Sequence, residues 1–255
     1  MNAFDEFYIG WQGRAPRTIG LFVRKMIIAL CMSVLAFGGI LAFVQHSIGI
    51  AIFEWGTHKM FTGTLRTSPY PHLSVRQPGK SAGQSDYLLV APFKHGLDPA
   101  PIAVLDGKPV TLIGTLIFRD NETMIEALPE TIKPASSNPD LPITSHESQL
   151  TNRVTLRGEI VDSKCYFGVM NPGRLTPHRG CAVRCISGGI PPVLLVQQED
   201  RPPTTYLLVS NDGSSVNKQI LDMVAEPIEI TADLVQQGSL KILRANPSTY
   251  RRLKK

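Results

Sequence analysis

Three cysteines and one histidine lie in a single segment of the 255-residue chain and are its best candidates for chemistry. They are Cys165, His178, Cys181 and Cys185, within Ser163 to Pro192, SKCYFGVMNPGRLTPHRGCAVRCISGGIPP. Thiolates and imidazoles are common ligands of zinc and copper, and thiolates also form disulfides and act as nucleophiles. The segment therefore points to a disulfide, a metal or cofactor site, or a redox thiol.

A short helix is predicted to carry the histidine and two of these cysteines. Thr176 fits the N-cap and Pro177 the first helical position. Gly188 and Gly189 supply a C-terminal stop. These signals predict a helix of about eleven residues, close to three turns.

The spacing on that helix places its reactive side chains on one face. His178, Cys181 and Cys185 follow one another at i, i+3 and i+7. Cys165 is expected at the end of the preceding strand, from where it could approach the same face. We therefore expect the four residues to gather in one cluster.

A disulfide is the first of three alternatives. Cysteines one turn apart on a helix have nearly parallel Cβ vectors and are poorly placed to bond each other, so Cys165 would pair with either Cys181 or Cys185. An extracytoplasmic location favours such a bond. The pairing leaves one thiol over, which a purely structural role does not explain.

The second alternative is a metal or cofactor site with Cys165, His178, Cys181 and Cys185 as ligands. These residue types fit a Cys₃His zinc shell, and a copper ion or a haem could also take one of them. His178 and Cys185 are about 10.5 Å apart along the predicted helix axis. One ion could join Cys181 to either of them easily, but all three only with strained rotamers.

The third alternative is a reactive thiol. Lys164, Arg179 and Arg184 lie close in sequence, and Cys181 lies near a helix N-terminus, so a thiol pKa here is expected to be lowered. The sequence shows no Ser-His-Asp arrangement, phosphate loop, HExxH motif or paired acidic motif. We assign no catalytic residue and favour a protein that is not an enzyme.

The elements that must position this segment form an internal repeat. Matching blocks follow in the same order: FTGTLRTSPYP from Phe61 and LRGEIVDSKCYF from Leu156, DYLLVAP from Asp86 and TYLLVSN from Thr205, PIAVLDG from Pro101 and QILDMVA from Gln219, KPVTLIGTLIF from Lys108 and EPIEITADLVQ from Glu226, TMIEAL from Thr123 and SLKILRA from Ser239. The blocks are short, rich in β-branched residues and bounded by turn residues. They predict about five strands per copy, with a short helix before the fourth, as in an OB-like barrel.

The repeat also acts as an internal control for the cysteine segment. Tyr70 of the first copy aligns with Cys165, and the predicted cysteine-bearing helix has no counterpart there. The fold itself therefore does not need the cysteines.

The N-terminal part of the chain predicts a membrane anchor. Met26 to Val44 is an uncharged run, and Arg14, Arg17, Arg24 and Lys25 precede it. Its length nearly spans a bilayer core, and the positive-inside rule places the N-terminus in the cytoplasm. A cleaved signal peptide is the alternative, but the run is longer than a typical hydrophobic region and no clear A-x-A site follows.

Composition excludes some classes of partner. Hydrophobic residues make up 43% of the chain, so a packed core is expected, and the net charge of +5 is spread along it. No aromatic platform accompanies the basic clusters, so no nucleic-acid partner is predicted.

The string VDSKCYFGVMNPG…HRGCAVRCISGGIPPVLL resembles a VDxKCY…CAxxC…GxP motif of small bacterial exported and membrane proteins. The resemblance covers about Glu159 to Val196; it implies an exported or membrane location and transfers no activity. By architecture alone, one anchor followed by an OB-like barrel also resembles the haem chaperone of cytochrome c maturation. That family attaches haem through a histidine in a short C-terminal motif with a downstream tyrosine, which has no counterpart here.

The expected fold is mainly β, with one transmembrane helix followed by two tandem OB-like barrels. Its predicted parts are a cytoplasmic segment 1–25, a transmembrane helix 26–53, a first barrel 58–128, a linker 129–150 and a second barrel 151–255 with the cysteine-bearing helix insertion.

The expected function is that of a membrane-anchored accessory or assembly subunit of a membrane redox system. Its location would be the bacterial inner membrane, with the soluble domains in the periplasm and other membrane or periplasmic subunits as partners. The alternatives are a thiol redox or haem- or metal-handling protein, and a structural envelope protein with a disulfide-braced loop.

Overall fold

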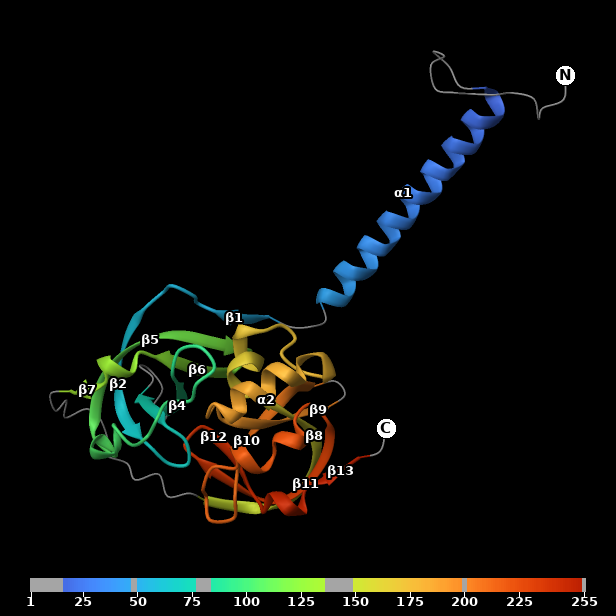
Figure 1. The fold of residues 1–255 in the computed structure, drawn as a ribbon. Coiled ribbons are helices and arrows are strands. Elements are labelled where there is room, and N and C mark those ends of the chain that lie inside the picture. The colour runs from blue at the N-terminus through green and yellow to red at the C-terminus, as the bar shows by residue number, and fades with distance from the viewer. Residues whose placement is uncertain (1–15, 47–49, 77–83, 136–148, 199–200, 254–255) are drawn as a thin grey trace. The chain divides into compact units, whose positions relative to one another are not determined.

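The computed structural model describes residues 16–46, 50–76, 84–135, 149–198 and 201–253. The chain divides into two compact units, Met1–Gly49 and Ile50–Lys255. The first contains one long helix and the second contains the strands (Figure 1).

Helix α1, Arg17–His46, is apolar along most of its length. The stretch Arg17–Gln45 is strongly apolar, and the most apolar part of it is not buried. Thirty residues at about 1.5 Å each exceed a hydrocarbon core of about 30 Å, so the helix is long enough to cross a membrane. An anchor and a signal sequence share these properties.

The predicted helix bounds of 26 and 53 are wrong at both ends. The helix begins at Arg17 because the polar residues before the apolar run continue its first turns. It ends at His46, and Ala51–Phe53 form strand β1, in which Ala51 pairs with Arg119. The apolar residues there serve a half-buried sheet position instead of a membrane.

The first barrel consists of five strands, and each pairs with two of the others. They are β2 Lys59–Arg66, β3 His72–Arg76, β4 Gln84–Val90, β5 Pro109–Arg119 and β6 Glu122–Ala127. The pairing runs β2–β3–β4–β6–β5 and back to β2, with β4 and β6 parallel. A short 3₁₀ helix, Ala103–Leu105, precedes the fourth strand, as predicted.

The second barrel repeats this order. Its strands are β8 Gln149–Asp162, β9 Pro192–Gln198, β10 Arg201–Val209, β11 Pro227–Gln237 and β12 Leu240–Arg244. They pair β8–β9–β10–β12–β11 and back to β8, with β10 and β12 parallel. Two 3₁₀ helices, Asn217–Gln219 and Leu221–Met223, precede the fourth strand, and β13 Arg251–Arg252 adds to β11. The predicted fold class is confirmed.

The predicted linker 129–150 contains ordered residues at both of its ends. Pro129–Thr131 form a 3₁₀ helix, β7 Lys133–Pro134 pairs with β5, and β8 already begins at Gln149. These ends are ordered because their backbone groups complete the sheets. Residues 136–148 lie outside the described residues.

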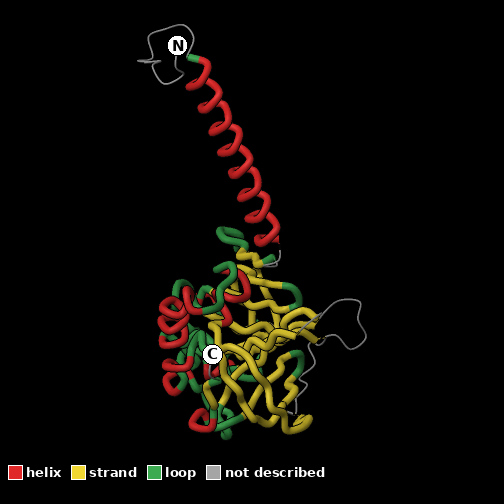
Figure 2. The backbone as a smooth tube through the Cα atoms, turned by 90° about the vertical axis from the view of Figure 1, so that its right-hand side faces the viewer, coloured by secondary structure: helices red, strands yellow, loops and turns green. Residues whose placement is uncertain are grey.

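The two barrels bury apolar side chains against each other as well as within themselves. One buried cluster joins Tyr70, Leu88 and Met124 of the first barrel to Phe167 and Val193 of the second. Each fully buried large side chain of this kind contributes about 1.5–3 kcal/mol relative to exposure. Figure 2 shows most of the short helical segments gathered along one side of the strands.

Candidate functional site

The strand-to-helix junction after β8 presents the first cysteine. Strand β8 ends at Asp162, and a π-helical turn, Cys165–Val169, follows. The Cys165 backbone N–H donates to Asp162 Oδ1 over 2.7 Å. This bond holds the start of the turn in place, because it satisfies a backbone donor in its first residues.

The predicted helix is present in two parts. Thr176–His178 form a 3₁₀ turn, and α2, Arg179–Ser187, continues from it. The role predicted for Thr176 is wrong, because the turn has no side-chain cap bond and begins after Leu175, whose φ is 69°. Gly188 ends the helix as predicted, with Gly189 at φ 98° after it.

The three predicted thiols lie together with Cys165 in the centre. Cys165 Sγ lies 3.9 Å from Cys181 Sγ and 3.9 Å from Cys185 Sγ. All four cysteines of the chain are described, and each is a free thiol. The disulfide expected at Cys165 is not formed, since 3.9 Å is well beyond the S–S bond length of about 2.05 Å.

His178 belongs to the same cluster. Its side chain is 7% exposed, and its Nε2 lies 3.0 Å from Asp162 Oδ2. Asp162 is fully buried. One of its carboxylate oxygens accepts from the Cys165 backbone N–H and the other contacts the His178 ring. No sequence motif marked this aspartate as part of the site, although it is the last residue of β8.

Two overlapping sets of ligand atoms result from this arrangement. Atoms of Cys165, His178 and Cys181 lie within 4.8 Å of one another, and so do atoms of Asp162, Cys165 and Cys185. Cys165 is common to both sets. His178 and Cys181 belong to one set, and Cys185 belongs to the other.

A lysine from the first barrel supplies the positive charge next to the thiols. Lys94 Nζ lies 2.8 Å from Cys181 Sγ and 3.8 Å from Cys185 Sγ. The bond to Cys181 raises the Lys94 pKa. A hydrogen bond from Cys165, helped by the Lys94 charge, lowers the pKa of Cys185, whereas giving that bond and being buried raise the pKa of Cys165.

Two of the basic residues predicted to activate a thiol are used elsewhere. The Lys164 ammonium is buried and forms an ion pair with Glu126. Arg179 Nη1 lies 2.5 Å from Glu226 Oε1. Proximity in sequence was misleading because the Lys164 and Arg179 side chains point to other partners, while Lys94 comes from a loop distant in sequence.

Glycines allow that loop to touch the end of α2. The Gly96 N–H donates to Gly188 O over 2.9 Å. A Cβ on Gly188 would lie 2.1 Å from Lys94 O, and one on Gly96 would lie 2.1 Å from Gly189 O. Residues 91–96, which we call the Lys94 loop, are therefore held against the cysteine-bearing segment by direct backbone contact.

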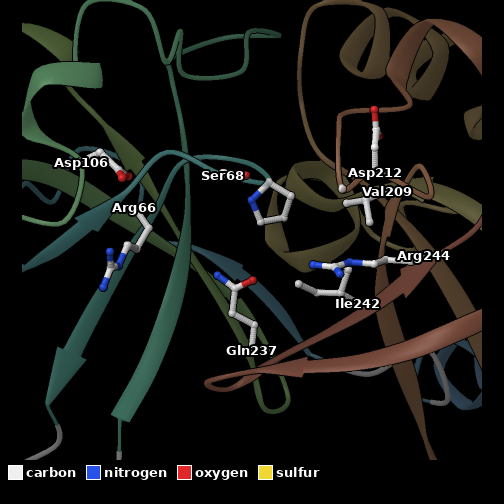
Figure 3. A pocket seen from close by; sticks show the side chains of 10 residues that line it. Arg66, Ser68, Asp106, Val209, Asp212, Gln237, Ile242 and Arg244 are labelled. Atoms are coloured by element: carbon white, nitrogen blue, oxygen red, sulfur yellow. The ribbon is translucent and has the colours of Figure 1, made fainter. Parts of the chain in front are cut away.

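A separate cavity of about 330 Å³ lies between the barrels and is lined by no residue of the predicted site. Arg66 and Arg244 lie on opposite walls (Figure 3). Asp212 in its rim already accepts bonds within its own turn. This cavity is thus distinct from the thiols.

No model of a known protein family matches the chain, and no curated protein matches it either.

Proposed function

We propose that the protein is a membrane-anchored, extracytoplasmic accessory or assembly subunit of a membrane redox system, and that its Cys/His cluster handles a soft metal ion. In a bacterium its location would be the inner membrane, with the N-terminus in the cytoplasm and the barrels in the periplasm. The apolar helix α1 and the positive residues Arg17, Arg24 and Lys25 near its start support this topology. Other membrane or periplasmic subunits would be its partners.

The observation that carries the metal proposal is the spacing of the sulfur atoms. Two sulfurs bound to one zinc ion at about 2.3 Å with tetrahedral angles lie about 3.8 Å apart. Cys165 Sγ is 3.9 Å from each of its two neighbours. Cys165, His178 and Cys181 supply three ligand atoms, and Cys185 is the fourth candidate.

The surroundings of these ligands support the same function. Metal-binding histidines usually donate their second N–H to a carboxylate, and Asp162 contacts the His178 ring. The Lys94 ammonium faces Cys181 and would offset the negative charge that several thiolates leave around one ion. Thiolates select Zn²⁺ or Cu⁺ over harder ions. Haem is a poorer fit because the His178 side chain is only 7% exposed, which leaves little room for a macrocycle next to its ring nitrogens.

Metal analysis of the full chain, purified in detergent and reduced, tests this proposal. After incubation with Zn²⁺ or Cu⁺ and removal of excess, we expect about one equivalent per chain, in line with a single ligand cluster. Cys165→Ser should abolish it, because Cys165 belongs to both ligand sets. Cys31→Ser, which changes the exposed cysteine of α1, is the matched control and should retain the metal. A wild-type chain that binds neither ion would disprove the proposal.

A thiol redox protein is the second candidate, and the contact between Lys94 and Cys181 favours it. In that case the Cys181 thiolate attacks a disulfide of a partner protein and Cys165 resolves the mixed disulfide. The two cysteines give two electrons to the partner disulfide, Cys165 and the solvent each supply one proton to its sulfurs, and a Cys165–Cys181 disulfide forms. Mass analysis after equilibration with oxidised glutathione separates the candidates. The redox function predicts loss of two thiols, whereas bound metal should protect them.

The proposed membrane anchor has its own test. The mass of the purified membrane protein should include Met1 to Val44, because an uncleaved helix retains them. A C-terminal alkaline phosphatase fusion should be active. A mass that corresponds to a chain without α1 would show that the helix is cleaved. An inactive fusion would show that the C-terminus lies in the cytoplasm.

A further inference from the structure

The three sulfur atoms of the cluster differ in access. Cys165 and Cys185 are 3% and 2% exposed. Cys181, in the first turn of α2, is only partly buried. The sulfur through which solvent and external ligands reach the cluster is therefore that of Cys181.

The cation at this accessible sulfur is itself exposed and belongs to the other barrel. Lys94 donates to Cys181 Sγ from the Lys94 loop, 87 positions earlier in the chain. Arg184, one helical turn after Cys181, is also exposed. The approach to the thiols is thus positively charged at the point where the first ligand lies.

The Lys94 loop is built to keep this position. The buried Lys164 ammonium donates to Ala91 O over 2.9 Å and to Phe93 O over 2.6 Å. Phe93 adopts a φ of 62°, a conformation that bulky residues rarely take and that persists only where the surroundings enforce it. At the other end of the loop, the Gly96 N–H donates a hydrogen bond to Gly188 O. The shape of the loop is therefore fixed around the residue that faces the sulfur.

We propose that Lys94 determines which form of the metal the site accepts, and that this form is an anionic thiolate complex. The inference rests on the proposed metal-binding function. A hydrated cation that approaches Cys181 meets a positive charge 2.8 Å from its first ligand and is repelled. A Cu⁺ ion with two external thiolates, or a Zn²⁺ ion with three, carries net negative charge and is attracted by the same ammonium.

Loading then proceeds by ligand exchange. A bond between the metal and an external thiolate breaks as the bond to Cys181 Sγ forms, and Cys165 and the remaining ligands follow. Each cysteine that enters the metal shell as a thiol gives its proton to a released external thiolate. The metal keeps its oxidation state, and no electrons are transferred.

The ratio of two loading rates tests the proposal on the full chain in detergent. The ion that the metal analysis returns is offered either with excess glutathione, as an anionic complex, or without thiolate, as Cu⁺ in acetonitrile or as zinc sulfate. Metal that stays with the protein on rapid desalting at successive times reports loading. We expect Lys94→Met to lower the ratio of the anionic to the cationic rate by about tenfold or more. Lys94→Arg should restore the ratio, because it restores the charge.

Lys108→Met, which removes another exposed lysine of the first barrel, is the matched control and should leave the ratio unchanged. A ratio that Lys94→Met does not change would overturn the inference. Equal slowing of both rates would also overturn it, because Lys94 would then have only a structural role. Failure of the wild-type chain to bind metal from either source would instead remove the proposed function on which the inference rests.

Discussion

The two barrels share one strand order but use the connection after their first strand differently. In the first barrel this connection is short and carries Tyr70, whose hydroxyl donates to Asn217 Oδ1 of the second barrel over 2.9 Å. In the second barrel it holds Cys165 and α2. Asn217 in turn donates to Ile186 O and Ile190 O at the end of the cysteine-bearing segment. The aligned residues thus differ: Tyr70 supports the cysteine-bearing segment through Asn217, whereas Cys165 lies in the cluster of thiols.

The connections after the third strand differ in the same sense. Each is closed by an isolated bridge, Val90 with Gly96 and Val209 with Ser215. The second barrel's loop bonds to itself through Asp212, which accepts from the Ser214 N–H over 3.0 Å. The first barrel's loop reaches across to Cys181 through Lys94. The first barrel therefore contributes Lys94 to the candidate site, although it lacks the cysteines itself.

Breaking the link between the barrels should have the largest effect. Lys164 and Glu126 form an ion pair with side chains 3% and 11% exposed. Lys164→Met leaves the Glu126 carboxylate buried without its partner, which costs about 3–5 kcal/mol of unfolding free energy. Denaturant unfolding of the detergent-solubilised chain measures this loss.

The matched control adds Glu126→Gln to the same variant. Removing both charges should recover much of the loss, since an apolar or neutral replacement of a whole buried pair is tolerated. If Lys164→Met were no less stable than the wild type, the buried ion pair would not couple the barrels. The two barrels would then behave as independent copies.

The sequence predicted the repeat better than it predicted the site. Five blocks in one order were enough for the two barrels, because strand periodicity and turn residues are local signals. Of the residues predicted to share one helix face, His178 and Cys181 belong to one set of ligand atoms and Cys185 to the other. Lys94 and Asp162 were missed, since neither the reach of a loop across a barrel interface nor the second bond of a carboxylate has a local signal. The end of α1 was misplaced because apolar residues fit both a membrane helix and strand β1.

Separating the barrels by one methyl group should have the next largest effect. Gly188→Ala places a Cβ 2.1 Å from Lys94 O, so the Lys94 loop must move. We expect a loss of about 1–3 kcal/mol, typical of overpacking. Gly180→Ala in the same helix is the control, because its Cβ would meet nothing within 4 Å. Thermal unfolding of both variants decides whether the contact is tight; equal melting temperatures would indicate that it is not.

Removing the Asp162 charge beside His178 should lower the metal affinity of the site. Asp162→Asn keeps an oxygen for the Cys165 N–H but removes the negative charge next to His178. Loss of such an outer partner typically lowers metal affinity 10- to 100-fold. Competition with a chromophoric chelator measures the change. An unaltered affinity would mean that His178 is not a ligand and would leave only the cysteines.

Removing the supporting hydroxyl of the first barrel should have the smallest effect at neutral pH and a distinctive one at high pH. Tyr70→Phe leaves Asn217 Oδ1 without its donor, which costs about 1–2 kcal/mol of unfolding free energy.

Burial raises the Tyr70 pKa from 10.0 to about 12. Above pH 10 the unfolded wild-type chain releases this proton while the folded chain keeps it, so wild-type stability falls until about pH 12. Two pKa units correspond to about 2–3 kcal/mol, which the variant does not lose. Unfolding free energies measured from pH 7 to pH 12 should therefore converge or cross; a constant difference would mean that the Tyr70 hydroxyl is not buried between the barrels.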